Sequence, residues 1–234
     1  MGGAPTWGII KTDAEFNDWR IRLAAIHCQT EKEWAQVLID TVLAKKQKAL
    51  VYTGTHHAFT KYAQPIVRDG KLLRTEDERF GQYVFRYVPQ RVFMIALHHP
   101  WPGLENYDAP RVLPANGAID DVLSGMKQQR IGFDLFGTPV GALVSDSAVY
   151  KHGHEPFTLD KFADGYIVLG LLSSIEPVHP IAGFINATNL EYARQNSPRP
   201  SARRMSAEEF NAQIASALEY VAGWKKIGPR STDR

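Results

Sequence analysis

Four short runs of mainly apolar residues recur along the chain, separated by longer segments in which apolar residues have helical spacing. Short, continuous apolar runs are typical of strands that are buried on both faces, as in parallel sheets. The pattern therefore predicts four strands. They are residues 49–53 (ALVYT), 91–97 (RVFMIAL), 130–136 (RIGFDLF) and 165–172 (GYIVLGLL).

Helices are predicted between and around these strands. Three capping boxes, each a Thr or Ser followed three residues later by Glu, predict helix starts at Thr12, Thr30 and Ser206. The helix after Thr30 is expected to run to about Lys46. Its apolar face would consist of Trp34, Val37, Leu38, Thr41 and Val42. Further helices are expected at residues 79–88, 118–129, 158–163 and 189–195, and the last helix would run from 206 to about 224.

Helices that alternate with apolar strands indicate an α/β fold. We predict a mainly parallel sheet of about four or more strands, with helices on both faces and C-terminal helices. Residues 1–234 are predicted to form a single α/β domain, with the alternative that the chain is the C-terminal part of a longer protein. Long helical connections favour parallel pairing, so residues 49–53 and 91–97 are expected to run parallel.

Two histidine pairs follow the first two predicted strands. His56 and His57 come after residues 49–53, and His98 and His99 come after residues 91–97. Ligands of open parallel sheets bind at the carboxyl ends of the strands. We therefore expect both pairs at one rim of the sheet, where a histidine can act as a general base.

Further polar residues extend this predicted rim. Asp134 lies in the third predicted strand, and the long loop after it carries a KHGHE segment. Imidazole and carboxylate groups are ligands of zinc, iron, nickel and copper. Two plainer interpretations stay open: adjacent side chains of an extended segment point apart, and loop histidines are often only exposed. The candidate ligands of a divalent transition metal are His56, His57, His98, His99, His152 and His154.

Three other residues are candidates for substrate binding. Arg79 would neutralise an anionic group, and Trp101 and Tyr107 would form walls of a pocket. The alternatives are an arginine on a helix surface and a turn specified by the prolines around Trp101. The chain has no G-x-S-x-G, P-loop or G-x-G-x-x-G motif, which disfavours a serine α/β-hydrolase and a nucleotide-binding protein of these types.

Gly54-Thr55-His56-His57 fits a G-x-x-H motif at a strand end, preceded by an amphipathic helix. In this respect the segment 31–59 resembles the superfamily of the erythromycin esterases, the ChaN-like haem-binding proteins, and the TraB and Tiki proteins. The later ADGYIVLG segment is similar to their C-terminal strand. The resemblance implies that Gly54 allows a close approach and that His57 takes part in metal binding or hydrolysis. These families also carry an earlier G-E-x-H-type motif, which is absent before residue 31, so the role of its glutamate has no assigned residue here.

Two functional hypotheses follow. The first is a metal-assisted or histidine-based hydrolase of an ester or amide bond in a small organic substrate, with His57, His99 (or His98) and Asp134 as catalytic residues. The second is a ChaN-like protein that binds haem or a transition metal without turnover, with a histidine as axial ligand. In the second case, Trp101, Tyr107 and Phe59 would contact the macrocycle.

Composition adds few restrictions. The 234 residues carry a net charge of +2 with scattered basic residues, which indicates no nucleic-acid partner. One cysteine excludes an internal disulfide. No apolar run reaches transmembrane length, and the first residues, MGGAPTWGII, lack the pattern of a signal peptide. We expect a soluble protein with a small-molecule substrate.

A third hypothesis is a homo-oligomer or larger assembly held together by the apolar face of the last helix, Phe210, Ile214, Leu218, Val221 and Trp224.

Overall fold

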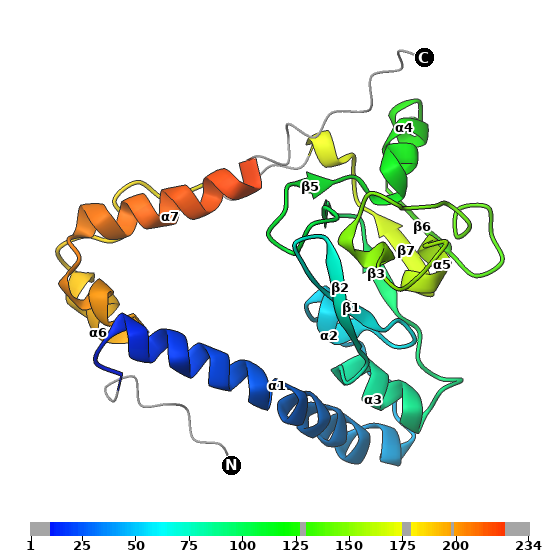
Figure 1. Cartoon of the computed structure of the whole chain (residues 1–234), viewed down its shortest axis with the longest axis horizontal. Coiled ribbons are helices and arrows are strands. Elements are labelled where there is room, and N and C mark those ends of the chain that lie inside the picture. The colour runs from blue at the N-terminus through cyan, green and yellow to red at the C-terminus, as the bar shows by residue number, and fades with distance from the viewer. Residues whose placement is uncertain (1–9, 127–129, 175–178, 198, 223–234) are drawn as a thin grey trace. The chain divides into compact units, whose positions relative to one another are not determined.

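The computed structural model describes residues 10–126, 130–174, 179–197 and 199–222. The chain divides into two units (Figure 1). The first combines Met1–His27 with Glu176–Gly223, and the second combines Cys28–Ile175 with Trp224–Arg234. The boundary lies inside helix α1 (Asp13–Thr41).

The first unit contains the start of α1 and the helices α6 (Leu190–Asn196), η6 (Pro200–Arg204) and α7 (Ala207–Ala222). Two predicted capping boxes are confirmed. The Glu15 N–H donates to Thr12 Oγ1 at 3.1 Å, and the Glu209 N–H donates to Ser206 Oγ at 3.2 Å. On α7, Phe210 and Ile214 are half-buried. The other predicted members of this apolar face, Leu218, Val221 and Trp224, lie outside the described side chains.

The third predicted capping box is wrong, because α1 continues through Thr30 as one helix to Thr41. Its sequence contains neither glycine nor proline, so nothing in it stops the helix. The predicted apolar face is also wrong. Trp34 is 47% exposed, whereas the buried stripe consists of Glu31, Ala35 and Ile39, spaced four residues apart.

The central sheet has three strands in the order β3 (Ile95–Leu97), β7 (Gly165–Val168) and β6 (Ile131–Asp134). β3 runs parallel to β7, and β6 runs antiparallel to β7 (Figure 1). The predicted sheet of four or more mainly parallel strands is therefore wrong. Three of the four predicted strands are present in shortened form, and residues 49–53 form none.

Residues 49–53 form no strand because the described part of the chain offers them no neighbouring backbone to pair with. Leu50 and Tyr52 are 94% and 90% exposed. The segment and β3 both line a cavity of about 700 Å³. A strand exists only through its ladder of hydrogen bonds, so an apolar sequence alone does not produce one.

The direction of β6 depends on the loop that follows it. Thr138 Oγ1 donates to the carbonyl oxygens of Asp134 and Leu135, which turns the chain back over the strand end. At Gly141 the chain passes so close to the Leu135 backbone that no Cβ fits between them. The Leu135 N–H then donates to the Asp164 carbonyl at 2.9 Å, just before β7. The loop therefore brings the chain back beside the end of β6. β7 begins there and runs antiparallel to β6.

A hairpin of β1 (Gln64–Arg68) and β2 (Lys71–Glu76) was missed in the sequence. Its two turn residues, Asp69 and Gly70, have φ values of 49° and 70°. Asp-Gly between two strands is the typical sequence of such a turn, so this signal was present. A second small antiparallel pair joins β4 (Trp101–Pro102) and β5 (Arg111–Val112).

Short helices surround these strands. The predicted helices at 79–88, 118–129, 158–163 and 189–195 correspond to α3 (Phe80–Tyr87), α4 (Ala118–Ser124), α5 (Leu159–Phe162) and α6, although residues 127–129 lie outside the described residues. The core of the second unit is an aromatic cluster in which Trp101 and Phe162 have ring centroids 4.6 Å apart. In the described residues, no helix combines the length and apolarity that crossing a membrane requires. The remaining elements are η2 (Leu43–Lys45), α2 (Thr55–Ala58), η3 (Pro114–Gly117), η4 (Val149–Lys151) and η5 (Leu172–Ser174).

Candidate functional site

The first histidine pair lies on α2, a single helical turn that begins after Gly54. The Gly54 carbonyl accepts hydrogen bonds from the N–H groups of His57 and Ala58, at 3.0 and 3.3 Å. The start of α3 packs directly against this turn, because a Cβ at Gly81 would lie 2.4 Å from the Ala58 carbonyl oxygen. At Gly54 itself a Cβ would meet His57 Cδ2 at 3.5 Å, an ordinary contact. The close backbone approach that the resemblance implied for Gly54 therefore occurs at Gly81 instead.

His57 is paired with a buried carboxylate from α1. Its Nδ1 lies 2.5 Å from Glu31 Oε1, and the Glu31 side chain is 0% exposed whereas that of His57 is 28% exposed. The other carboxylate oxygen accepts the Phe80 N–H at 2.8 Å. Because the carboxylate accepts from Nδ1–H, the neutral imidazole carries its lone pair on Nε2.

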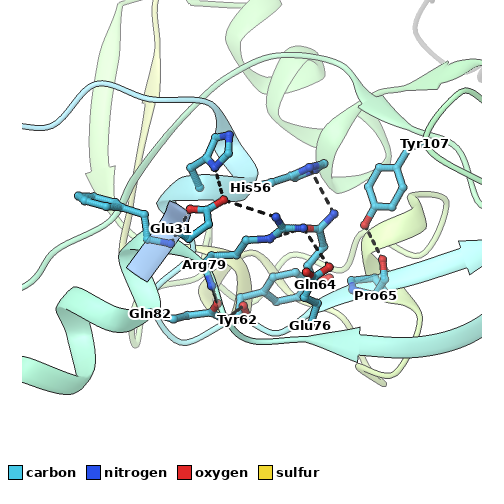
Figure 2. Close-up of polar contacts among 11 residues, drawn as sticks. Glu31, His56, Tyr62, Gln64, Pro65, Glu76, Arg79, Gln82 and Tyr107 are labelled. Carbon is cyan, nitrogen blue, oxygen red and sulfur yellow. Dashed lines mark hydrogen bonds and ion pairs between the residues drawn. The ribbon is translucent and has the colours of Figure 1, made fainter. Parts of the chain in front are cut away.

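Arg79 organises the polar layer beneath the two histidines. Figure 2 shows its guanidinium between Glu31, Gln64 and Glu76. Nη1 lies 3.5 Å from Glu31 Oε1, and Nη2 donates to Gln64 Oε1 at 2.8 Å and to Glu76 Oε2 at 3.0 Å. The Arg79 side chain is only 11% exposed. The residue was predicted to bind substrate; here it pairs with the buried Glu31 and the half-buried Glu76, and it is not part of the pocket wall described below.

His56 has both ring nitrogens in hydrogen bonds. Since Gln64 Oε1 accepts from Arg79, its Nε2 donates to His56 Nδ1 at 3.3 Å, and His56 Nε2–H donates to the Tyr150 hydroxyl at 2.9 Å. Burial, together with the charge of Arg79, lowers the pKa of His56 to about 4. His56 is therefore a neutral hydrogen-bond donor at pH 7.

His99, from the second pair, reaches the same place. Its Nδ1 lies 2.9 Å from the Pro100 carbonyl oxygen, which can only accept, so Nδ1 carries the proton. Nε2 then accepts from the Thr55 hydroxyl at 3.3 Å. Burial lowers the pKa of His99.

These side chains surround a pocket of about 350 Å³. Two tyrosines close one side of it, and the pKa values of both hydroxyls are raised by burial, that of Tyr107 to about 12. Tyr107 donates to the Pro65 carbonyl at 2.6 Å (Figure 2). The wall consists of Gly54, Thr55, His56, His57, His99, Pro100, Pro102, Tyr107, Arg111 and Tyr150.

His98 points away from this pocket. Its side chain is 1% exposed and bonds to the Tyr166 hydroxyl at 2.9 Å and to Asp120 Oδ2 at 3.0 Å. Asp120 also accepts the Leu172 N–H at 3.0 Å. His98 therefore connects α4 to the sheet, and it lines the larger cavity instead.

Four further predicted site residues do not line the pocket. Asp134 is exposed at the end of β6, and Trp101 is fully buried in the core. His152 Nε2 lies 3.0 Å from the Leu104 carbonyl oxygen, and His154 Nε2 lies 2.8 Å from that of Ala63. Both loop histidines therefore fix backbone segments.

The donor set for a metal ion is limited. Among the described side chains, no group of three or more His, Cys, Asp and Glu is arranged to hold an ion. Both nitrogens of His56 and of His99 already have hydrogen-bond partners. These observations do not test the metal and haem sites, which stay predictions.

Sequence reasoning missed several residues of the site. Glu31 gave no signal, because the sequence predicted a different apolar face for this helix, and the buried stripe of Glu31, Ala35 and Ile39 is seen only in the structure. Gln64, Arg111 and Tyr150 come from elements far apart in sequence and carry no local signal either.

Comparisons of the chain with protein-family models, with curated proteins and with solved structures found no match. The resemblance to the erythromycin esterase, ChaN-like and TraB–Tiki superfamily therefore stays a prediction.

Proposed function

We propose that this pocket hydrolyses an ester or amide bond in a small organic substrate, with His57 as the general base. The observation that supports this most directly is the 2.5 Å contact between His57 Nδ1 and the fully buried Glu31 carboxylate. A histidine on a pocket wall, oriented by a buried carboxylate, is the arrangement that hydrolases use to activate an oxygen nucleophile.

The proposed reaction uses water as the nucleophile. His57 Nε2 accepts a proton from water as the water oxygen attacks the substrate carbonyl, and Glu31 stabilises the resulting imidazolium. When the carbonyl re-forms, the bond to the leaving oxygen or nitrogen breaks, and Nε2–H gives its proton to that atom. The products are a carboxylic acid and an alcohol or amine.

Tyr150 is the proposed donor to the developing oxyanion. Its hydroxyl accepts from His56 Nε2–H, which orients its own O–H, and burial raises its pKa, so that it keeps its proton. A preorganised O–H in a site shielded from water stabilises negative charge that appears only in the transition state.

A metal-assisted reaction and a haem-binding function remain hypotheses. No step of the proposed reaction passes through either group. Metal analysis of the purified protein and a search for a Soret band on haem addition test them separately.

The proposed function predicts a large effect of His57→Ala on hydrolysis of a panel of 4-nitrophenyl esters. We expect kcat/KM to fall by about 100-fold or more, because removal of a general base costs roughly two to four orders of magnitude. Glu31→Gln should reduce kcat more than it changes KM, since it removes the charge that stabilises the imidazolium.

His152→Gln is the matched control, because it removes a histidine outside the pocket. Circular dichroism should show that all three variants are folded. If the folded His57→Ala variant hydrolyses every ester at the wild-type rate, His57 has no catalytic function.

A further inference from the structure

The larger cavity, of about 700 Å³, adjoins the pocket of the proposed reaction. Gly54, Thr55 and His99 line both, so the cavity and the pocket meet just after the segment 51–53 and just after β3. A substrate whose reacting group lies in the pocket therefore has the larger cavity directly beside it. Small-molecule sites commonly have volumes of roughly 300–1,000 Å³, so the cavity can hold a large part of a substrate.

The wall of the larger cavity is mainly apolar. It contains no Asp, Glu, Lys or Arg, and the ring of His98 is only 1% exposed, with both nitrogens in hydrogen bonds. Both ring nitrogens of His99 also have partners. A wall of this kind offers little to a charged group. Its apolar side chains are Val51, Tyr52, Ala58, Met94, Ile95, Ala96, Leu97 and Leu169.

Several of these apolar side chains are in contact with water. Val51, Ile95, Leu97 and Leu169 are all exposed, although they come from three separate parts of the second unit. Exposed apolar side chains that gather around one cavity mark a binding site more often than scattered ones do. An apolar group placed between them would remove their surface from water, which is favourable.

The shape of the cavity favours an extended group. Residues 94–97 are consecutive and all line it. Because side chains of a strand alternate between its two faces, a cavity that touches every residue in turn lies along the edge of the strand. The opposite edge of β3 is paired with β7. At about 3.3 Å per residue, this side of the cavity is roughly 10 Å long, which matches a chain better than a compact ring system.

We infer that the substrate is an ester or amide with a long unbranched apolar chain, which lies in the larger cavity while the carbonyl group lies in the pocket. This inference rests on the proposed function for the reaction itself. The contact between the cavity and the pocket at Gly54, Thr55 and His99 allows one molecule to occupy both. The chain belongs either to the acyl group or to the leaving group, and two series of esters distinguish these cases.

Methyl ketones test the binding step without turnover, because they carry a carbonyl group and cannot be hydrolysed. In the wild-type chain, we expect 2-octanone to bind at least 10-fold more tightly than 2-butanone by NMR titration, since each fully buried methylene strengthens binding roughly three- to fourfold. The backbone amide signals of residues 51–55 and 94–97 should shift with 2-octanone.

A double variant, Ile95→Gln with Leu169→Gln, should weaken 2-octanone binding by at least 5-fold and leave 2-butanone unchanged. Both leucine-sized positions are exposed, so the polar side chains should not disturb the core. Leu73→Gln is the matched control, because Leu73 is an exposed leucine of β2 outside the cavity wall. Circular dichroism should show that both proteins are folded.

Turnover gives the second test. We expect kcat/KM to rise at least 10-fold either from 4-nitrophenyl acetate to 4-nitrophenyl octanoate, which places the chain on the acyl side, or from ethyl acetate to octyl acetate, which places it on the leaving group. Hydrolysis with no dependence on chain length in either series would overturn the inference.

The ketone experiment has its own contrary outcomes. Equal affinities for 2-octanone and 2-butanone, shifts confined to residues outside the cavity, or full 2-octanone affinity in the folded double variant would each overturn the inference. A protein that binds 2-octanone in the cavity but hydrolyses no ester would retain this site and lose only the proposed function.

Discussion

His56 shows how burial determines the state of a single residue. A histidine in water changes charge near pH 6.5, whereas His56 is held neutral by burial and by the charge of Arg79. Its two hydrogen bonds, from Gln64 and to Tyr150, fit only the neutral ring. Protonation would give both nitrogens a hydrogen and break the bond from Gln64.

This difference predicts acid destabilisation. The pKa of His56 is about 4 in the folded chain and 6.5 in the unfolded chain, so the unfolded state binds more protons between these values. The stabilising contribution is complete above pH 6.5 and is lost as the pH falls toward 4. We expect this contribution to the free energy of unfolding to be about 3 kcal/mol, measured by urea unfolding from pH 7.5 to 4.5.

His56→Gln should flatten the pH dependence over this window. His152→Gln serves as the comparison, since it removes a histidine that bonds to the Leu104 carbonyl away from the pocket. An unchanged slope in His56→Gln would show that other groups cause the acid sensitivity.

At the scale of elements, the site depends on the contact between α2 and α3. The turn with His57 and the helix start with Arg79 and Phe80 both bind Glu31 of α1. Gly81 permits this contact, because any side chain there would meet the backbone of Ala58 and Phe59.

Gly81→Ala should therefore separate α2 from α3. The added Cβ would lie 2.4 Å from the Ala58 carbonyl oxygen, and backbone cannot move away as a side-chain end can. We expect a loss of about 1–3 kcal/mol in the free energy of unfolding, as for other overpacking changes, together with lower esterase activity. Thermal and urea unfolding measure the first effect.

Gly125→Ala is the matched control, because its nearest atom would be 3.8 Å away and its φ of −84° suits alanine. If both alanine variants are equally stable, the contact between α2 and α3 is not as tight as described.

At the scale of the whole molecule, the core cluster and the pocket belong to the second unit. The core residues lie between Phe59 and Val168, and the pocket wall lies between Gly54 and Tyr150. Glu31 is the part of the site nearest the unit boundary, on the same helix as His27 and Cys28.

A chain shortened to residues 13–174 should therefore fold and keep the site. It retains all of α1, so Glu31 is not placed at a frayed helix end, and it lacks the C-terminal helices. We expect cooperative thermal unfolding and the esterase activity of the full-length chain. Loss of cooperative unfolding would instead support one domain over the whole chain, as the sequence suggested.

The sequence by itself determined features that depend on residues close together in the chain. The capping boxes at Thr12 and Ser206 are examples, because their hydrogen bonds join residues three positions apart. The helices after Arg79 and Gly117 also follow from local periodicity, and the Asp69-Gly70 turn was detectable in the same way.

Only the tertiary structure decided which distant residues meet. The apolar run at 49–53 resembles a strand locally, but a strand needs a partner backbone that its own sequence cannot specify. The direction of β6 depended on a loop that folds back at Gly141. Glu31 and His57 are 26 positions apart, and His56 and Tyr150 are 94 apart. Their contacts, and with them the charge and protonation of the site, arise from burial and packing, which no local pattern encodes.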